Sequence, residues 1–163
     1  MKLIHAGLAA LALASVLPAH AQTSTEFENV AMAVVGKCLE LKPSATTAQS
    51  AVDTCSKVVT DMATLKQAAG TLAGHDQNVY LVVSSMAHSR VGNAYSFLDG
   101  GVRTARVCAK IEEAWGLTSQ IAPAASPAYA DMVNQLRTTT VSTIAKCRNE
   151  FGAPAGAAPL PPG

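Results

Sequence analysis

Three observations predict an all-α fold for this chain. Apolar residues recur at three- and four-residue spacing over most of its length, with almost no strand-like alternation. Proline and glycine divide the chain into about five such segments. Four cysteines lie on the predicted apolar stripes. We therefore predict a compact bundle, or an array of helical hairpins, with about five helices cross-linked by disulfides.

The first segment, residues 1–21, is predicted to be a cleaved signal peptide. Lys2 gives a positive start, residues 8–17 form a short apolar run, and Ala-His-Ala at 19–21 has the pattern of a cleavage site. The apolar run is too short for a membrane anchor. We expect an exported protein, periplasmic or secreted, with no membrane span after cleavage and a helical domain over residues 22–151.

The first two helices of this domain are expected on either side of Pro43. Thr25 and Glu28 have the spacing of a capping box, and the apolar stripe that follows ends before the proline. The second helix is expected to begin near residues 46–47 and to end at Gly70.

The third helix has the clearest pattern. Asp76 is a good N-cap, an apolar face follows over residues 79–98, and Asp-Gly-Gly at 99–101 ends the helix. Leu81 and Val82 lie away from the main apolar stripe. With Ser85 and His88 they mark a candidate contact surface, although a bundle packed on both sides gives the same pattern.

The last two helices flank a loop over residues 117–126. The fourth is expected to begin near Val102, and the fifth after Ser126-Pro127, an N-cap followed by a proline at the first helical position. The fifth helix ends near Phe151. The Pro/Ala/Gly-rich tail, residues 152–163, is expected to be disordered.

The four cysteines, Cys38, Cys55, Cys108 and Cys147, are expected to form two disulfides, as an even number of inward cysteines does in an exported protein. Cys38 and Cys55 flank the first turn with an axial offset of about 7–8 Å in an antiparallel hairpin. We favour this pair, which leaves Cys108 with Cys147. The rival pairing joins Cys38 to Cys147 and Cys55 to Cys108, and four reduced thiols are the remaining alternative.

Charge argues against nucleic acid as a partner. Signal cleavage removes Lys2, and the remaining chain balances 11 basic against 11 acidic residues. Nucleic-acid binding needs a concentrated basic surface that releases counterions. Binding to an anionic membrane by charge also needs an excess of basic residues. The composition has no excess of basic residues that would favour either partner.

The mature chain shows no pattern of catalytic, cofactor or metal-binding residues. His75 and His88 point about 140° apart on one helix, so they do not form a ligand pair. His88 with Ser84 or Ser85 lacks a carboxylate at sequence level, and a catalytic triad needs one to orient the imidazole. An enzyme is not expected. The test of that hypothesis is whether a carboxylate such as Asp53 or Glu112 reaches His88.

Four stretches resemble parts of tetratricopeptide repeats. AMAVVGKCLELKP (31–43) is similar to a second repeat helix with its closing proline, and RVGNAYSFL (90–98) to a first helix. AVDTC (51–55) and ARVC (105–108) resemble the starts of second helices. The resemblance implies a helical-hairpin scaffold that binds a protein or peptide. No 34-residue period runs through the chain, and an alanine-rich amphipathic bundle gives similar matches.

These observations favour a non-enzymatic binding protein that acts through protein–protein interaction, such as an inhibitor or immunity-type protein. The expected partner is another exported or periplasmic protein. The alternative is a carrier for a small apolar ligand. That alternative predicts a continuous apolar cavity between helices, lined by small residues such as Ala87, Ala94 and Ala105.

Overall fold

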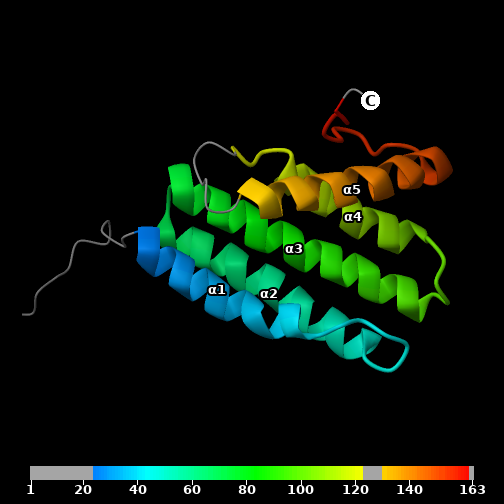
Figure 1. Ribbon diagram of the computed structural model, residues 1–163, viewed down its shortest axis with the longest axis horizontal. Coiled ribbons are helices and arrows are strands. Elements are labelled where there is room, and N and C mark those ends of the chain that lie inside the picture. Colours follow the sequence, from blue (N-terminus) through cyan, green and yellow to red (C-terminus); the bar gives the residue numbers. More distant parts are fainter. Residues whose placement is uncertain (1–23, 123–129, 162–163) are drawn as a thin grey trace, which may run out of the picture.

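The computed structural model describes residues 24–122 and 130–161. Within these ranges the chain forms five helices and no strand: α1 (Ser24–Glu40), α2 (Ala48–Ala69), α3 (Gly74–Leu98), α4 (Ala105–Thr118) and α5 (Ala130–Phe151). Successive helices run back and forth along the long axis of the molecule (Figure 1). The prediction of an all-α fold with about five helices is confirmed.

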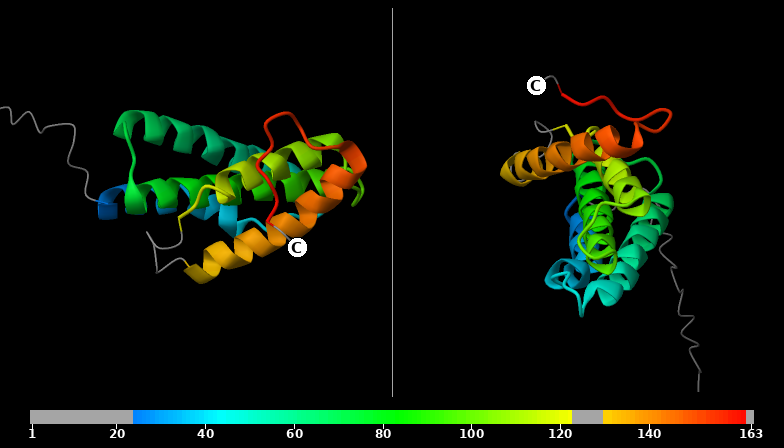
Figure 2. Two further views of the ribbon diagram at one scale, coloured as in Figure 1. Left: turned by 90° about the horizontal axis from the view of Figure 1, so that it is seen from above. Right: turned by 90° about the vertical axis from the view of Figure 1, so that its right-hand side faces the viewer.

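Helix α3 is the centre of the bundle, because it packs against all four other helices. Helices α1 and α2, here called the N-terminal hairpin, lie on one side of it (Figures 1 and 2). Helices α4 and α5, the C-terminal hairpin, lie on the other side. The two hairpins therefore meet through α3.

The sequence of α3 suits this central position because apolar or small residues occur on several of its sides. Val79, Val83 and Val91 are buried in the main cluster with the N-terminal hairpin. Leu81 and Val82 are buried in a second cluster that includes residues of α5. A helix that is apolar on several sides is typical of a buried position. The main cluster contains eleven buried residues: Phe27, Ala31, Val35, Cys38, Cys55, Val58, Met62, Val79, Val83, Ala87 and Val91.

Each hairpin is closed by a disulfide. Cys38 is bonded to Cys55 and Cys108 to Cys147, which confirms the favoured pairing. All four cysteines are at least 95% buried. Disulfides are typical of an oxidising compartment. In the part of the chain that the structure describes, no helix has the length and hydrophobicity needed to cross a membrane.

Helix α4 approaches α3 closely at two points. A Cβ added to Gly92 would lie 2.9 Å from Cδ1 of Ile111, so the end of the Ile111 side chain would have to move to admit a larger residue where the two helices cross. Nearby, the buried Ser85 hydroxyl donates to the carbonyl of Ala114 at 3.0 Å and lies 2.5 Å from the Thr118 hydroxyl. These contacts satisfy polar groups that are costly to bury alone.

Two helix starts differ from the prediction. Helix α3 begins at Gly74 rather than after Asp76, and no side chain caps it. Helix α4 begins at Ala105 rather than near Val102. Asp99, whose pKa is lowered to about 2 by hydrogen bonds from Arg106 and then Thr104, holds the α3–α4 turn. The expected signal peptide and the Ser126-Pro127 cap lie outside the described residues.

The tail after α5, for which the composition predicts disorder, contacts the C-terminal hairpin in the structure. Trp115 Nε1 donates to the carbonyl of Ala158 at 3.2 Å, and Arg148 Nη2 donates to the same oxygen at 2.8 Å. Ala158 and Leu160 pack on the apolar cluster between α4 and α5. The composition of the tail suggested a disordered segment, but these contacts hold its backbone in place.

Candidate functional site

A partly open apolar groove lies over α3, because α1 and α5 do not pack against each other anywhere in the described ranges. We call it the methionine groove. It is lined by eight apolar side chains: Met32, Val35 and Leu39 of α1; Val79, Val82, Val83 and Met86 of α3; and Met132 of α5. The cavity between these side chains measures about 50 Å³.

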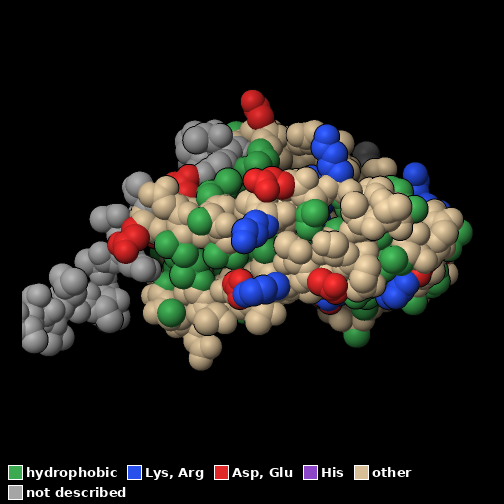
Figure 3. Space-filling view, turned by 90° about the horizontal axis from the view of Figure 1, so that it is seen from below, with side chains coloured by type: hydrophobic (Ala, Val, Ile, Leu, Met, Phe, Trp, Pro, Cys, Tyr) green, Lys and Arg blue, Asp and Glu red, His purple; other side chains and the backbone are tan. Residues whose placement is uncertain are grey.

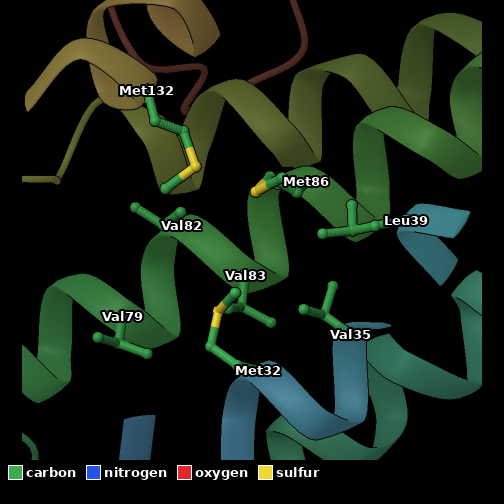
Figure 4. Close-up of a pocket in the computed structure, with 8 residues that line it drawn as sticks. All are labelled: Met32, Val35, Leu39, Val79, Val82, Val83, Met86 and Met132. Carbon is green, nitrogen blue, oxygen red and sulfur yellow. The ribbon is translucent and has the colours of Figure 1, made fainter. Parts of the chain in front are cut away.

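Figure 4 shows how the three helices contribute to the groove. The valines of α3 form its floor, Met32 and Val35 rise from α1 on one side, and Met132 reaches in from α5 on the other. Val35 is fully buried, whereas Met32 is 42% exposed. The valines of the floor are buried as well, so the groove has a closely packed floor, and flexible methionine side chains form its rim.

The spacing of α1 explains why Met32 is on the rim. The sequence predicts an apolar stripe of Phe27, Val30, Val34, Cys38 and Leu41 on this helix. Phe27 and Cys38 are buried as predicted, and Ala31 and Val35 are buried as well. Val30 is 40% exposed. The observed stripe therefore differs from the predicted one mainly at Val30, and Met32 lies at the edge of the buried face, beside the groove.

A contact between a histidine and a carboxylate lies one helical turn beyond the groove. Glu28 is four residues before Met32 in α1, and His75 is four residues before Val79 in α3. Both side chains therefore lie one turn from the groove, toward the N-terminal ends of their helices. Nε2 of His75 lies 2.9 Å from Oε2 of Glu28, which joins α1 to α3. Burial raises the pKa of the neighbouring Asp76, although His75 lowers it in part. This end of the groove is therefore polar.

The contact surface predicted from α3 is wrong. Leu81, Val82 and Ser85 are 2%, 3% and 0% exposed, and the His88 side chain is 12% exposed. Leu81 and Val82 face α5, and Ser85 bonds to α4, because the C-terminal hairpin covers this side of α3. The bundle packs on both sides of α3, which was the alternative interpretation. Of the four residues only Val82 lines the groove.

A carboxylate does reach His88, but it is neither Asp53 nor Glu112. Oε2 of Glu113 lies 2.6 Å from Nδ1 of His88, and Lys110 Nζ lies 2.7 Å from the same oxygen. Burial lowers the pKa of His88, with an opposing effect from Glu113. The contact joins α3 to α4.

Neither serine completes a catalytic arrangement with this histidine. Ser85 bonds to Ala114 and Thr118. The Ser84 hydroxyl is buried without a hydrogen-bond partner among the described residues. A Ser-His pair needs a hydrogen bond between nucleophile and base. His88 has no such bond to either serine among the described residues, and its Nδ1 lies close to Glu113 without hydrogen-bond geometry.

Surface charge gives no second site. On the face formed by α1 and α2, acidic and basic side chains are interspersed among apolar ones (Figure 3). No group of three or more His, Cys, Asp or Glu side chains suited to a metal ion occurs in residues 24–122 and 130–161. The methionine groove is the feature of the described surface that is best suited to binding.

Sequence reasoning missed this groove. It needs residues from three helices that are far apart in the chain, and methionines at helical spacing are usually core residues. A signal did exist, because Met32 falls outside the predicted stripe of α1.

No protein-family model matches this chain, and no significant similarity was found to curated proteins or to solved structures. The resemblance to tetratricopeptide repeats therefore stays a prediction.

Proposed function

We propose that this is an exported, non-enzymatic binding protein whose methionine groove holds an apolar helix of a partner protein. The observation that supports this is the groove itself, in which eight apolar side chains from three helices converge. An amphipathic helix binds such a groove by inserting apolar residues at positions i, i+3, i+4 and i+7.

The size of the cavity supports a protein partner over an enclosed ligand. Sites that enclose small molecules commonly measure about 300–1,000 Å³, whereas this cavity measures about 50 Å³. That space suits one or two side chains projecting from a partner. Methionines at the rim adapt their shape to the inserted groups.

The partner is expected in the same compartment as this protein. The two buried disulfides fit an oxidising environment, and the N-terminal sequence has the pattern of a signal peptide. A periplasmic or secreted protein with an amphipathic helix, such as an enzyme that this chain inhibits, has the required chemistry.

A photo-crosslinking experiment tests the proposal. A diazirine amino acid is placed at position 32 of the full chain, and in a matched variant at position 30, which is equally exposed on another side of α1. We expect position 32 to cross-link to an amphipathic helix of one protein, and position 30 not to.

The affinity of the protein for the purified partner then shows whether binding depends on the groove. Met32→Glu places a charge at the groove, and we expect it to weaken binding by at least about tenfold, because the bound helix would bury the carboxylate against apolar groups. Val30→Glu is the control and leaves affinity unchanged. Equal effects of the two substitutions would contradict the proposal.

The alternative, a carrier for a small apolar ligand, has weaker support. Two of the small residues expected to line its cavity, Ala87 and Ala94, are fully buried in packed core, and Ala105 is exposed. None of them lines the groove. In the crosslinking experiment, a small-molecule adduct at position 32 would favour the carrier.

A further inference from the structure

The tail that follows α5 occupies a site of its own on the C-terminal hairpin. The chain turns back after Phe151, and a turn over residues 154–157 is closed by the Ala157 amide, which donates to the Pro154 carbonyl at 3.1 Å. Gly156, at the third position of this turn, has a φ of 76°, which favours glycine. Residues 157–161 then run across α4 and α5.

The sequence Ala-Pro-Leu-Pro at 158–161 is suited to an extended conformation. Each proline restricts its own φ and disfavours the helical conformation of the residue before it. In an extended chain alternate residues share a face. Ala158 and Leu160 pack on the helices, whereas Pro159 and Pro161 are exposed. The segment therefore loses little conformational entropy when it binds.

The helices offer this segment both hydrogen-bond donors and an apolar surface. Trp115 Nε1 and Arg148 Nη2 both donate to the Ala158 carbonyl. Arg148 is held by Glu112 through two hydrogen bonds of 2.8 and 2.9 Å. Five buried residues form the surface beneath: Cys108, Ile111, Trp115, Ile144 and Cys147.

These contacts have the properties of a peptide-recognition site. A backbone carbonyl is read by fixed donors, an apolar surface accepts a leucine, and the bound segment is extended and proline-flanked. We infer that the Trp115–Arg148 face is a binding site for extended segments of the Ala-Pro-Leu-Pro type from a partner protein, and that the chain's own tail competes for it. This site shares no residue with the methionine groove.

The covalent link between the tail and α5 gives the tail an advantage over a segment from another protein. Five residues, 152–156, link it to α5, so its effective concentration at the site is in the millimolar range. An equivalent segment from another protein binds only when it outcompetes the tail or when the tail is released. The tail therefore acts as a built-in inhibitor of this site.

Two full-length variants test the inference. Leu160→Asp puts a charge at the packed position and should release the tail, whereas Ala155→Asp puts the same charge at an exposed tail position. Trp115 is the single tryptophan of the chain, so its fluorescence reports on the site. We expect a red shift and greater acrylamide quenching in Leu160→Asp, and neither change in Ala155→Asp.

A peptide with the sequence of residues 153–161 is then added to each variant. We expect it to reverse the red shift of Leu160→Asp saturably, and to bind that variant at least about tenfold more tightly than Ala155→Asp. The same peptide carrying the Leu160→Asp change should not bind. Circular dichroism and the intact disulfide mass establish that both variants are folded.

Two results would overturn the inference. If the two variants have the same Trp115 emission, the tail does not cover the site. If the tail is released but the peptide does not restore the emission, the face does not bind such segments from outside the chain.

Discussion

Each of the two hairpins is closed by one disulfide, but the two disulfides are expected to contribute differently to stability. The disulfide of the N-terminal hairpin closes a separation of 17 residues, and that of the C-terminal hairpin closes 39. The N-terminal hairpin shares the eleven-residue cluster with α3. By contrast, α5 has few contacts with α3 and depends on α4, on the tail and on its disulfide. A disulfide contributes most to holding a helix in place where the helix has little other packing. We therefore expect α5 to be the first helix to detach when its disulfide is removed.

The largest expected effect comes from removing the disulfide of the C-terminal hairpin. For Cys108→Ala with Cys147→Ala we expect a loss of about 4 kcal/mol of unfolding free energy, since a longer loop gains more entropy when it is released. For Cys38→Ala with Cys55→Ala the same relation gives about 3 kcal/mol. Urea denaturation of the two double variants measures both values.

Hydrogen exchange adds a regional readout to this comparison. In the Cys108/Cys147 variant, α5 amides should exchange by local opening while α1 and α2 stay protected. Uniform loss of protection along the chain would contradict the view that α5 is the weakly attached helix.

A second prediction concerns the crossing of α3 and α4, which is where the C-terminal hairpin is attached. Gly92→Ala would place a Cβ 2.9 Å from Ile111. We expect it to destabilise the protein by about 1–3 kcal/mol, as overpacking does. Thermal unfolding measures the loss, and a companion Ile111→Val change should recover part of it by removing the Cδ1 atom.

A third prediction concerns pH and the same interface. Burial lowers the pKa of His88 from 6.5, although Glu113 opposes the shift and Lys110 adds to it. Because the folded state prefers neutral His88, this stability is present above pH 6.5 and is lost as the pH falls below that value. Unfolding free energy measured at pH 7.5 and 5.5 should fall less in His88→Gln than in the unmodified protein. An equal fall in both would exclude His88 as the cause.

The smallest expected effect lies in the N-terminal hairpin. No atom lies within 4 Å of a Cβ added to Gly36, in contrast to Gly92. Gly36→Ala should therefore stabilise the protein by about 0.5–1 kcal/mol through helix propensity. Thermal unfolding checks the sign, and a destabilised Gly36→Ala would show that the helix of this hairpin is more constrained than its packing indicates.

The fold followed from the sequence to a large extent, whereas the site did not. Pro43 and Gly70 mark the ends of α1 and α2 within a few residues, since their effects on the backbone are local. The polar residues of α3 have an environment that their positions on the helix do not indicate. Ser85 and His88 look solvent-facing on a single helix, but Ala114 and Glu113 of α4 provide their partners.

The sequence by itself determined the helices, their approximate ends and, through the spacing of Cys38 and Cys55 about a short turn, the favoured disulfide pairing. These depend on periodicity and local backbone preferences, which act over a few residues. Only the tertiary structure decided that α3 is covered on both sides, that methionines of α1, α3 and α5 converge, and that Trp115 and Arg148 hold the tail. Such contacts join residues far apart in the chain, and their free energy depends on how whole helices pack.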